Sequence, residues 1–198
     1  MTGKPEEDAK IIGRVLAGDA NCFEAIVEKY EKMIYNLALS KTQNRESAQD
    51  ISQECFLRAY KMLASYRTEG AFSTWIYRIC QNLIYDYYRK SKKIQTVSLS
   101  NFDEYGESPH EKELEDLEGD PSEKLVRSEK IQKVRELIDS LPDDLREIII
   151  LRDLNDISYA QISEMLGIEE GTVKSRLHRA REKLKSHVLK YFSKDELF

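Results

Sequence analysis

Proline and glycine are scarce in this chain of 198 residues, which contains four prolines and eight glycines. Turn-rich β architectures depend on both residue types, so their scarcity favours a helical fold. No apolar run approaches the ~20 residues that a membrane-spanning helix needs. The first ten residues are polar and acidic and lack the apolar stretch of a signal peptide. The sequence therefore predicts a soluble, cytoplasmic protein.

Cysteine and histidine are also scarce, with three residues of each. Cys22, Cys55 and Cys80 each fall in an apolar helical pattern, which predicts free thiols in the core. The histidines have no cysteine or carboxylate neighbours at zinc-binding spacing, so we expect no metal site. The sequence also lacks a glycine-rich phosphate loop and a nucleophile elbow. An enzyme is therefore the least favoured class of protein, and no cofactor is expected.

Charge is segregated along the chain, although the net charge is only −5. Ten acids and a single base lie between residues 103 and 123, whereas seven bases and a single acid lie between residues 171 and 190. A local basic stripe matters more for DNA binding than the total charge does. The basic segment is therefore a candidate nucleic-acid-binding element.

Apolar residues recur every three or four positions in two separate parts of the chain. This periodicity predicts one helical domain over residues 1–92 and a second over residues 126–198. Ser73 is expected to cap the last helix of the first domain. Residues 93–125 lack the periodicity and carry the acidic run, which predicts a flexible acidic linker. The expected fold class is all-α, with two small helical domains.

The segment from Ser158 to Leu184 has the spacing of a helix-turn-helix motif. Residues Ser158 to Gln161 have the form of a capping box that opens a short helix, and Gly167 supplies the turn. The second helix has an apolar face, which we expect to lie in the core. This face consists of Val173, Leu177, Ala180 and Leu184.

The opposite face of this second helix is polar and basic, and it is the predicted DNA-reading surface. Its residues are Thr172, Lys174, Ser175, Arg176, His178 and Arg179. A recognition helix enters the major groove by its N-terminal half, so these side chains would meet base edges and phosphates. The alternative is an ordinary amphipathic helical hairpin with a solvated basic face, which the turn glycine, the cap and the one-sided charge disfavour.

Three segments resemble helices of the extracytoplasmic-function (ECF) sigma factors of bacterial RNA polymerase. Residues 171–184, GTVKSRLHRAREKL, closely resemble the helix that reads the −35 promoter element. Residues 48–60, AQDISQECFLRAY, are similar to the helix that binds the polymerase. Residues 72–83, FSTWIYRICQNL, resemble the helix that reads the −10 element. The resemblance implies a protein that binds core RNA polymerase, recognises both promoter elements and promotes DNA opening.

The resemblance also implies roles for single residues. Asp50, Gln53 and Glu54 would dock on the coiled coil of the largest polymerase subunit. The candidates for contact with the −10 element are Phe72, Ser73, Trp75, Arg78, Asn82, Asp86 and Arg89. Bases and aromatic side chains alternate in this segment, a composition that suits single-stranded DNA. We expect the helix face that carries Trp75, Ile79, Leu83 and Tyr87 to be mostly buried.

Members of this family are usually held inactive by an anti-sigma protein in the membrane, so the resemblance implies such a partner and a stress or envelope response. The strongest alternative is a stand-alone helix-turn-helix regulator, whose N-terminal half would sense a signal or dimerise. That regulator would bind promoters without polymerase. Two interpretations of the acidic linker stay open, namely a nucleic-acid mimic in the RNA exit region and a merely soluble tether.

Overall fold

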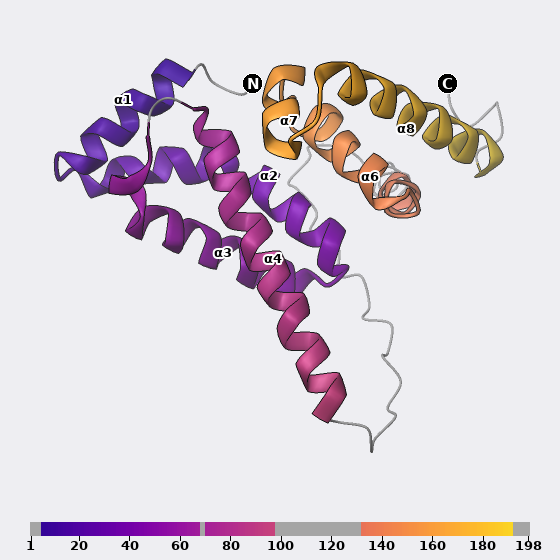
Figure 1. Ribbon diagram of the computed structural model, residues 1–198, viewed down its shortest axis with the longest axis horizontal. Helices are drawn as coiled ribbons and strands as arrows, with labels where there is room; N and C mark the ends of the chain where they lie inside the picture. Colours follow the sequence, from indigo (N-terminus) through magenta and orange to yellow (C-terminus); the bar gives the residue numbers. More distant parts are fainter. Residues whose placement is uncertain (1–4, 68–69, 98–131, 192–198) are drawn as a thin grey trace, which may run out of the picture.

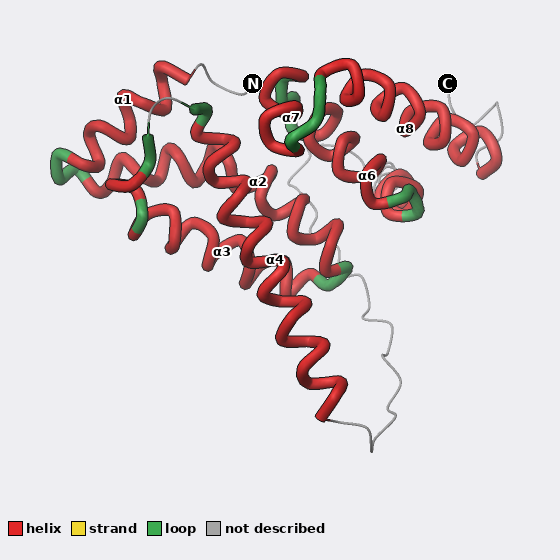
Figure 2. Tube along the Cα trace, viewed as in Figure 1, coloured by secondary structure: helices red, strands yellow, loops and turns green. Residues whose placement is uncertain are grey.

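The computed structural model describes residues 5–67, 70–97 and 132–191, and every regular element among them is a helix (Figure 1, Figure 2). The helices form an N-terminal domain and a C-terminal domain, which lie against each other. The expectation of an all-α fold with two helical domains is confirmed. Within the described ranges, no helix combines the length and the apolar character that a membrane span requires.

The N-terminal domain is built from four α-helices and two short 3₁₀ turns. In chain order these are α1 (Pro5–Leu16), η1 (Ala20–Cys22), α2 (Phe23–Thr42), α3 (Arg45–Lys61), η2 (Leu63–Ser65) and α4 (Phe72–Val97). Gln43, with a left-handed φ of 51°, reverses the chain between α2 and α3. Asn44 then caps α3 by accepting a hydrogen bond of 2.8 Å from the backbone N–H of Ser47. This tight connection makes α2 and α3 packed neighbours.

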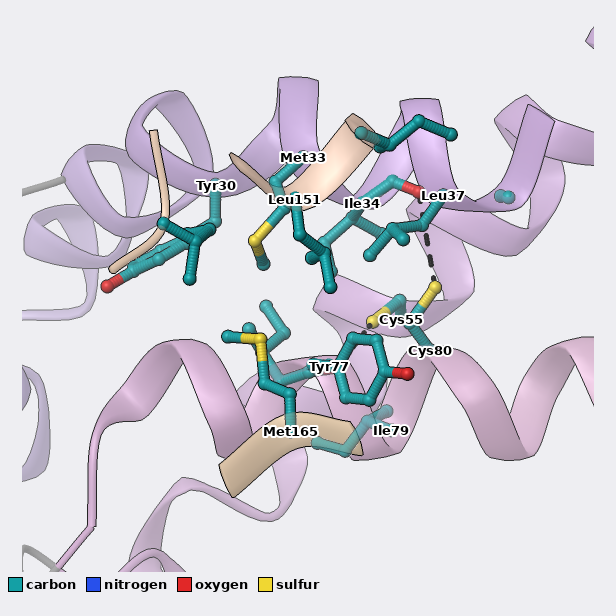
Figure 3. Packing of buried hydrophobic residues seen from close by; sticks show 14 of the residues in the cluster. Tyr30, Met33, Ile34, Leu37, Cys55, Tyr77, Ile79, Cys80, Leu151 and Met165 are labelled. Atoms are coloured by element: carbon teal, nitrogen blue, oxygen red, sulfur yellow. Dashed lines mark hydrogen bonds between the residues drawn. The ribbon is translucent and has the colours of Figure 1, made fainter. Parts of the chain in front are cut away.

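The core of the N-terminal domain lies where α4 crosses α2 and α3 (Figure 1, Figure 3). Ile26, Ile34, Cys55, Ile76 and Cys80 are all fully buried there. The Cys55 thiol donates to the backbone carbonyl of Ile76 over 3.7 Å. All three cysteines are free, and two of them lie in this core. The prediction of free core thiols is therefore confirmed for Cys55 and Cys80.

A buried carboxylate attaches α1 to the rest of the N-terminal domain. Asp8 is 2% exposed and accepts a hydrogen bond of 2.6 Å from the Tyr30 hydroxyl. It also forms an ion pair with Lys29, whose side chain is 15% exposed. Burial, and then the hydrogen bond to Asp8, raises the pKa of Tyr30, so the phenol remains a donor. Both partners of Asp8 belong to α2, so this contact fixes α1 on α2.

Buried residues of the C-terminal domain belong to the same hydrophobic cluster as the core of the N-terminal domain. The C-terminal domain contains a helix over residues 132–139, followed by α6 (Asp143–Ile149), the π-helical turn η3 (Ile150–Leu154), α7 (Tyr159–Leu166) and α8 (Glu170–Tyr191). The last helix, α8, packs on α6 and α7. Residues of α6, η3, α7 and α8 are fully buried, namely Ile148, Leu151, Ile162, Val173 and Ala180.

Two expectations about α4 differ from the structure. Ser73 is not a helix cap, because α4 begins at Phe72 and includes Ser73 in its first turn. The Ser73 hydroxyl instead accepts a hydrogen bond of 3.3 Å from the Gln161 side chain of α7. At its other end α4 continues to Val97, beyond the expected boundary at residue 92, because no proline or glycine interrupts it. The remainder of the predicted linker, residues 98–125, lies outside the described residues.

Candidate nucleic-acid and polymerase interface

The helix-turn-helix motif has the local geometry that its sequence predicts. The Ser158 hydroxyl accepts from the Gln161 backbone N–H, and the Gln161 side chain accepts from the Ser158 backbone N–H, both over 3.3 Å. This reciprocal pair begins α7. Gly167 ends α7 in a left-handed conformation with φ of 64°, which glycine adopts without a steric penalty. The predicted capping box and turn are both confirmed.

Helix α8 presents the predicted DNA-reading residues on its surface. Val173, Leu177 and Ala180 are buried on the opposite face, as expected. The predicted residues divide into an exposed group, Lys174, Ser175, His178 and Arg179, and a half-buried pair, Thr172 and Arg176. Arg176 is held 3.9 Å from a carboxylate oxygen of Asp144 on α6. This face of α8 is therefore exposed, as a helix that enters the major groove of DNA requires.

Fixed ion pairs orient α8 against the rest of its domain. The Arg181 guanidinium donates two hydrogen bonds, of 3.0 and 2.5 Å, to the Asp153 carboxylate of η3. The hydrogen bond from Arg181 to Asp153 also raises the pKa of the guanidinium. Nearby, the Lys174 ammonium lies 5.9 Å from the centre of the Tyr159 ring of α7. Arg181 therefore positions the recognition helix, and it is less free than Arg179 to meet a phosphate.

Helix α4 carries a polar stripe of four residues with helical spacing, namely Arg78, Asn82, Tyr85 and Arg89. All four are exposed, and the Tyr85 side chain has the largest exposed fraction, 70%, among the exposed large hydrophobic residues of the described chain. Three members of this stripe, Arg78, Asn82 and Arg89, were predicted from the sequence to contact the −10 element, and Tyr85 was not among the predicted site residues. The spacing from Arg78 to Asn82 to Tyr85 would have identified it. Asp86 lies beside the stripe, where it accepts a hydrogen bond of 2.9 Å from Arg89.

Three other residues predicted for the −10 element occupy different environments. Phe72 is 1% exposed and packs against Tyr30, Tyr66 and Trp75 with ring centres 5.3–5.4 Å apart. The Phe72 ring is therefore part of the aromatic core, and in this structure it offers no exposed surface to DNA. Ser73 is also 1% exposed, and α7 of the other domain covers it. Trp75 is half-buried on the face that the sequence predicted to face the core.

Helix α3 presents the predicted polymerase-binding residues on one side. Asp50 and Gln53 are exposed, and Glu54 is half-exposed. The Glu54 carboxylate accepts a hydrogen bond of 2.7 Å from Arg58, which lowers the pKa of Glu54. Leu57 lies one turn further along the same side and is 54% exposed. An acidic surface that ends in an exposed leucine can bind a partner helix through both charge and apolar contact.

The described residues contain no group of three or more histidines, cysteines or acids that could hold a metal ion. The site residues predicted from the sequence that are exposed lie on three surfaces, which are the α8 face, the α4 stripe and the acidic side of α3.

Two family models match separate parts of the chain. Residues 26–94 match sigma-70 region 2, and residues 131–184 match sigma-70 region 4. The first match contains α3 and the polar stripe of α4. The second match contains the helix-turn-helix motif. The three surfaces therefore all fall within the matched regions.

Two proteins that match about nine tenths of the chain also contain both of these regions in one alignment. The chain is 35% identical over 179 residues to the ECF RNA polymerase sigma factor SigW of Bacillus subtilis, a match that covers 90% of the chain and 95% of SigW. It is 33% identical over 187 residues to the ECF RNA polymerase sigma-E factor of Escherichia coli K12, covering 91% of the chain and 94% of that protein. The chain belongs to the ECF family of RNA polymerase sigma factors. An ECF sigma factor directs RNA polymerase to promoters and is not an enzyme.

Two solved structures share the fold of this sigma factor. CnrH, in complex with the cytosolic domain of CnrY, matches with a TM-score of 0.61 at 19% identity, covering 92% of this sigma factor and 97% of that chain. The sigma factor RpoE of Bartonella quintana, in complex with the anti-sigma factor NepR, matches with a TM-score of 0.63 at 24% identity, covering 85% and 97%. These matches show that the helical architecture extends over both domains.

Proposed function

We propose that the exposed face of α8 reads the −35 element. Arg179 is exposed, and no carboxylate of the described residues forms an ion pair with it. Its guanidinium is free to bond to O6 and N7 of a guanine, a contact worth about 1–3 kcal/mol of discrimination. Lys174, Ser175 and His178 lie beside it and would contact neighbouring bases or phosphates. Arg176 and Thr172 are less exposed and would contribute at the edge of this surface.

The α4 stripe would bind the −10 element as the DNA melts. Arg78 and Arg89 supply positive charge to the strand, and Asn82 supplies hydrogen bonds to base edges. The exposed ring of Tyr85 offers a stacking surface, and base stacking on an aromatic side chain contributes about 1–3 kcal/mol per base. Asp86 acts indirectly in this proposal, because it holds Arg89 in place. Trp75 would support the stripe from the half-buried face.

The acidic side of α3 would bind the coiled coil of the largest polymerase subunit. Asp50, Gln53 and Glu54 supply the polar contacts, and Leu57 adds apolar area. This surface contains no residue of the two proposed DNA sites, so polymerase and DNA can bind the protein simultaneously.

The proposed setting is the cytoplasm, with an anti-sigma factor as regulatory partner and a stress or envelope response as the output. The support for the partner is the bound state of RpoE with the anti-sigma factor NepR in a structure of the same fold. Membership of the ECF family supports the cytoplasmic location and the stress or envelope response. In this proposal the anti-sigma factor is the membrane-anchored partner.

The observation that carries the proposed function is the open face of α8 within a region 4 match. The test is run-off transcription by core RNA polymerase and the purified protein on a random promoter pool, followed by sequencing of the transcribed templates. We expect two enriched elements about 25 base pairs apart. Arg179→Ala should relax base preference in the upstream element only, whereas Asn82→Ala should relax it in the downstream element only. Unchanged preferences in both variants would refute the assignment of the two surfaces.

A further inference from the structure

Two of the three surfaces, the acidic side of α3 and the α4 stripe, lie on helices that pack directly against each other. The acidic side of α3 is the proposed polymerase-binding surface, and the stripe is the proposed −10-binding surface. Helix α4 crosses α3 in Figure 1, so polar side chains of the two helices can meet along the crossing. A contact between such side chains would connect polymerase binding with DNA binding.

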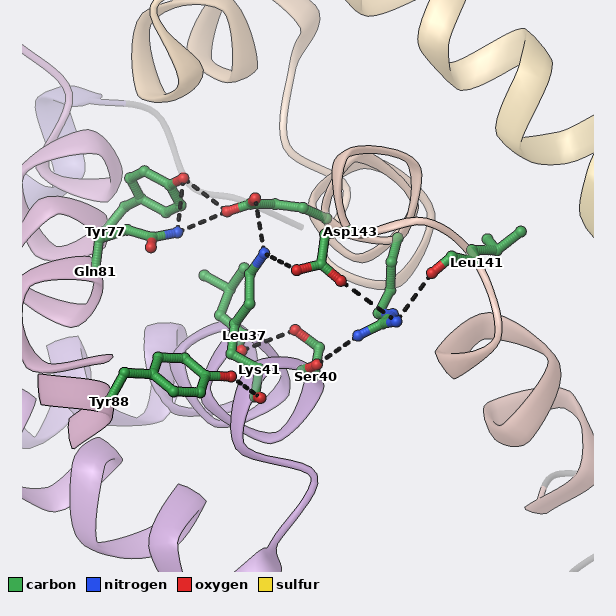
Figure 4. A network of polar contacts seen from close by, with 10 residues as sticks. Leu37, Ser40, Lys41, Tyr77, Gln81, Tyr88, Leu141 and Asp143 are labelled. Atoms are coloured by element: carbon green, nitrogen blue, oxygen red, sulfur yellow. Dashed lines mark hydrogen bonds and ion pairs between the residues drawn. The ribbon is translucent and has the colours of Figure 1, made fainter. Parts of the chain in front are cut away.

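The α4 stripe has two borders with different neighbours. On one border, Tyr77 and Gln81 donate hydrogen bonds of 2.7 and 2.6 Å to the Glu147 carboxylate of α6 (Figure 4). Asp86 follows Tyr77 by about two and a half helical turns, which places it on the opposite side of α4. The Asp86 border therefore faces away from α6, and the cation beside it is Arg58 of α3.

Arg58 contacts one carboxylate on each of the two helices. Its Nε donates a hydrogen bond of 2.7 Å to Glu54 on α3. Its Nη1 lies 4.0 Å from Oδ2 of Asp86 on α4. The hydrogen bond from Arg58 lowers the pKa of Glu54, and the charges of Lys61 and Lys90 add to this effect. Since Lys90 belongs to α4, Glu54 lies within electrostatic range of charges on both helices.

Asp86 extends this connection to the DNA-binding stripe. Its Oδ1 atom accepts a hydrogen bond of 2.9 Å from Arg89. The side chains of Glu54, Arg58, Asp86 and Arg89 therefore alternate in charge from the acidic side of α3 to the stripe, and we call this set the charge path. Its last member, Arg89, has the most exposed side chain, at 81%, whereas the other three are 37–45% exposed.

The contacts along the charge path differ in strength. Charge-assisted hydrogen bonds are about 2.7–2.9 Å long, and the contacts of Arg58 with Glu54 and of Arg89 with Asp86 both have such lengths. The contact between Arg58 and Asp86, at 4.0 Å, is longer than a hydrogen bond. The charge path thus consists of two tight pairs, one on each helix, joined by a loose contact. A partner that binds one tight pair can therefore change the other.

We infer that polymerase binding and −10 binding are coupled through Arg58, which acts as a positioning residue for Arg89. A basic side chain of the polymerase that binds Glu54 competes with Arg58 for that carboxylate. The released guanidinium of Arg58 then moves toward Asp86, which loosens the hold of Asp86 on Arg89. Arg89 becomes available to a phosphate of the melted strand. This exchange rests on the proposed function, because it requires polymerase on α3 and DNA on α4.

The exposure of the four side chains limits the size of the coupling. A pair of exposed charges changes an equilibrium constant by up to about fivefold. Coupling between two binding events is reciprocal. Polymerase should therefore tighten −10 binding through the charge path by up to about fivefold, and −10 DNA should tighten polymerase binding by the same factor.

A double-mutant cycle on the holoenzyme tests this exchange. Each full-length variant is assembled with an excess of core polymerase. The measured quantity is its dissociation constant for a fluorescent single-stranded oligonucleotide that carries the downstream element enriched in the run-off selection. Arg58→Gln removes the charge that displaces Arg89 and should weaken binding by up to about fivefold. In an Asp86→Asn background Arg89 is already released, so Arg58→Gln should have no further effect.

The salt dependence of the same binding gives an independent measurement. One phosphate contact with a single strand contributes about 0.7 to the slope of log affinity against log salt. Arg58→Gln should lower this slope by up to about 0.7, because Asp86 then retains Arg89. Adding Asp86→Asn to Arg58→Gln should restore the slope. Arg58→Lys keeps the positive charge and should keep most of the DNA affinity.

Lys61→Gln is the matched control, because it removes the same charge from the exposed end of α3, one turn after Arg58. A general loss of positive charge weakens DNA binding equally with and without Asp86→Asn, and this is the result expected for Lys61→Gln. All members of the charge path lie at the surface, so these substitutions leave the core intact, which circular dichroism of each variant checks.

The outcomes distinguish failure of the coupling from failure of the proposed function. An equal effect of Arg58→Gln with and without Asp86→Asn would overturn the coupling, because Arg58 would then act on DNA directly or on the fold. Unchanged DNA binding by Arg58→Gln alone would overturn it as well. If Arg78→Ala and Asn82→Ala also leave DNA binding unchanged, the assignment of the stripe itself is refuted. A loss of DNA binding in those two variants confines the failure to the charge path.

Discussion

Replacing Asp8 by alanine should destabilise the N-terminal domain strongly. The substitution leaves the Tyr30 hydroxyl, in a side chain 3% exposed, without its acceptor, which costs about 1–3 kcal/mol. Breaking a fully buried ion pair costs about 3–5 kcal/mol. Lys29 is 15% exposed, so its ammonium can turn toward water and recover part of that loss. The expected loss in the free energy of unfolding is therefore about 2–4 kcal/mol.

The single tryptophan makes this loss measurable in the N-terminal domain alone. Trp75 packs against Tyr66 and Phe72 in that domain, with ring centres 5.4 Å apart in both cases. Its fluorescence in a urea titration follows the unfolding of the surrounding aromatic core. Glu7→Ala is the matched control, because Glu7 precedes Asp8 in α1 and is exposed, and it should change stability by less than about 1 kcal/mol. Equal midpoints for the two variants would refute the role given to Asp8.

Three further substitutions test the C-terminal domain. Arg179→Ala should weaken binding of the holoenzyme to its own promoters by about 1–3 kcal/mol relative to promoters altered in the −35 element, as measured by competition binding. Lys185→Ala, at an exposed position, should weaken binding to all promoters equally and reduce the slope of log affinity against log salt by about 1. Ser158→Ala removes the reciprocal cap of α7 and should lower the unfolding free energy by about 1 kcal/mol, with no change in base preference. Identical promoter selectivity of Arg179→Ala and Lys185→Ala would contradict the division into base and phosphate contacts.

Local sequence signals predicted the C-terminal domain well. The capping box at Ser158, the turn at Gly167 and the apolar face through Val173 depend on residues that are close in the sequence, and each is present as expected. Periodicity also placed Ile79 and Leu83 in the core of the N-terminal domain. These features could be predicted because helical spacing and caps are determined locally.

Contacts between distant segments could not be predicted in the same way. Phe72 resembles a DNA-binding residue in the sequence, yet it is buried by Tyr30 and Tyr66, which no local pattern identifies as its neighbours. The contacts of Glu147 with Tyr77 and Gln81 join residues about 70 positions apart. Tyr85 could have been selected from its spacing, but its exposure depends on how α4 packs on α2 and α3. The tertiary arrangement determines all of these environments.

We propose that this sigma factor contacts both promoter elements only when core polymerase is bound. Hydroxyl-radical footprinting on a selected promoter, with and without core polymerase, measures this dependence. We expect protection of both the −10 and the −35 elements in the presence of core polymerase and protection of neither by the free protein at the same concentration. Equal protection by the free protein would contradict the claim and would identify a stand-alone DNA-binding regulator.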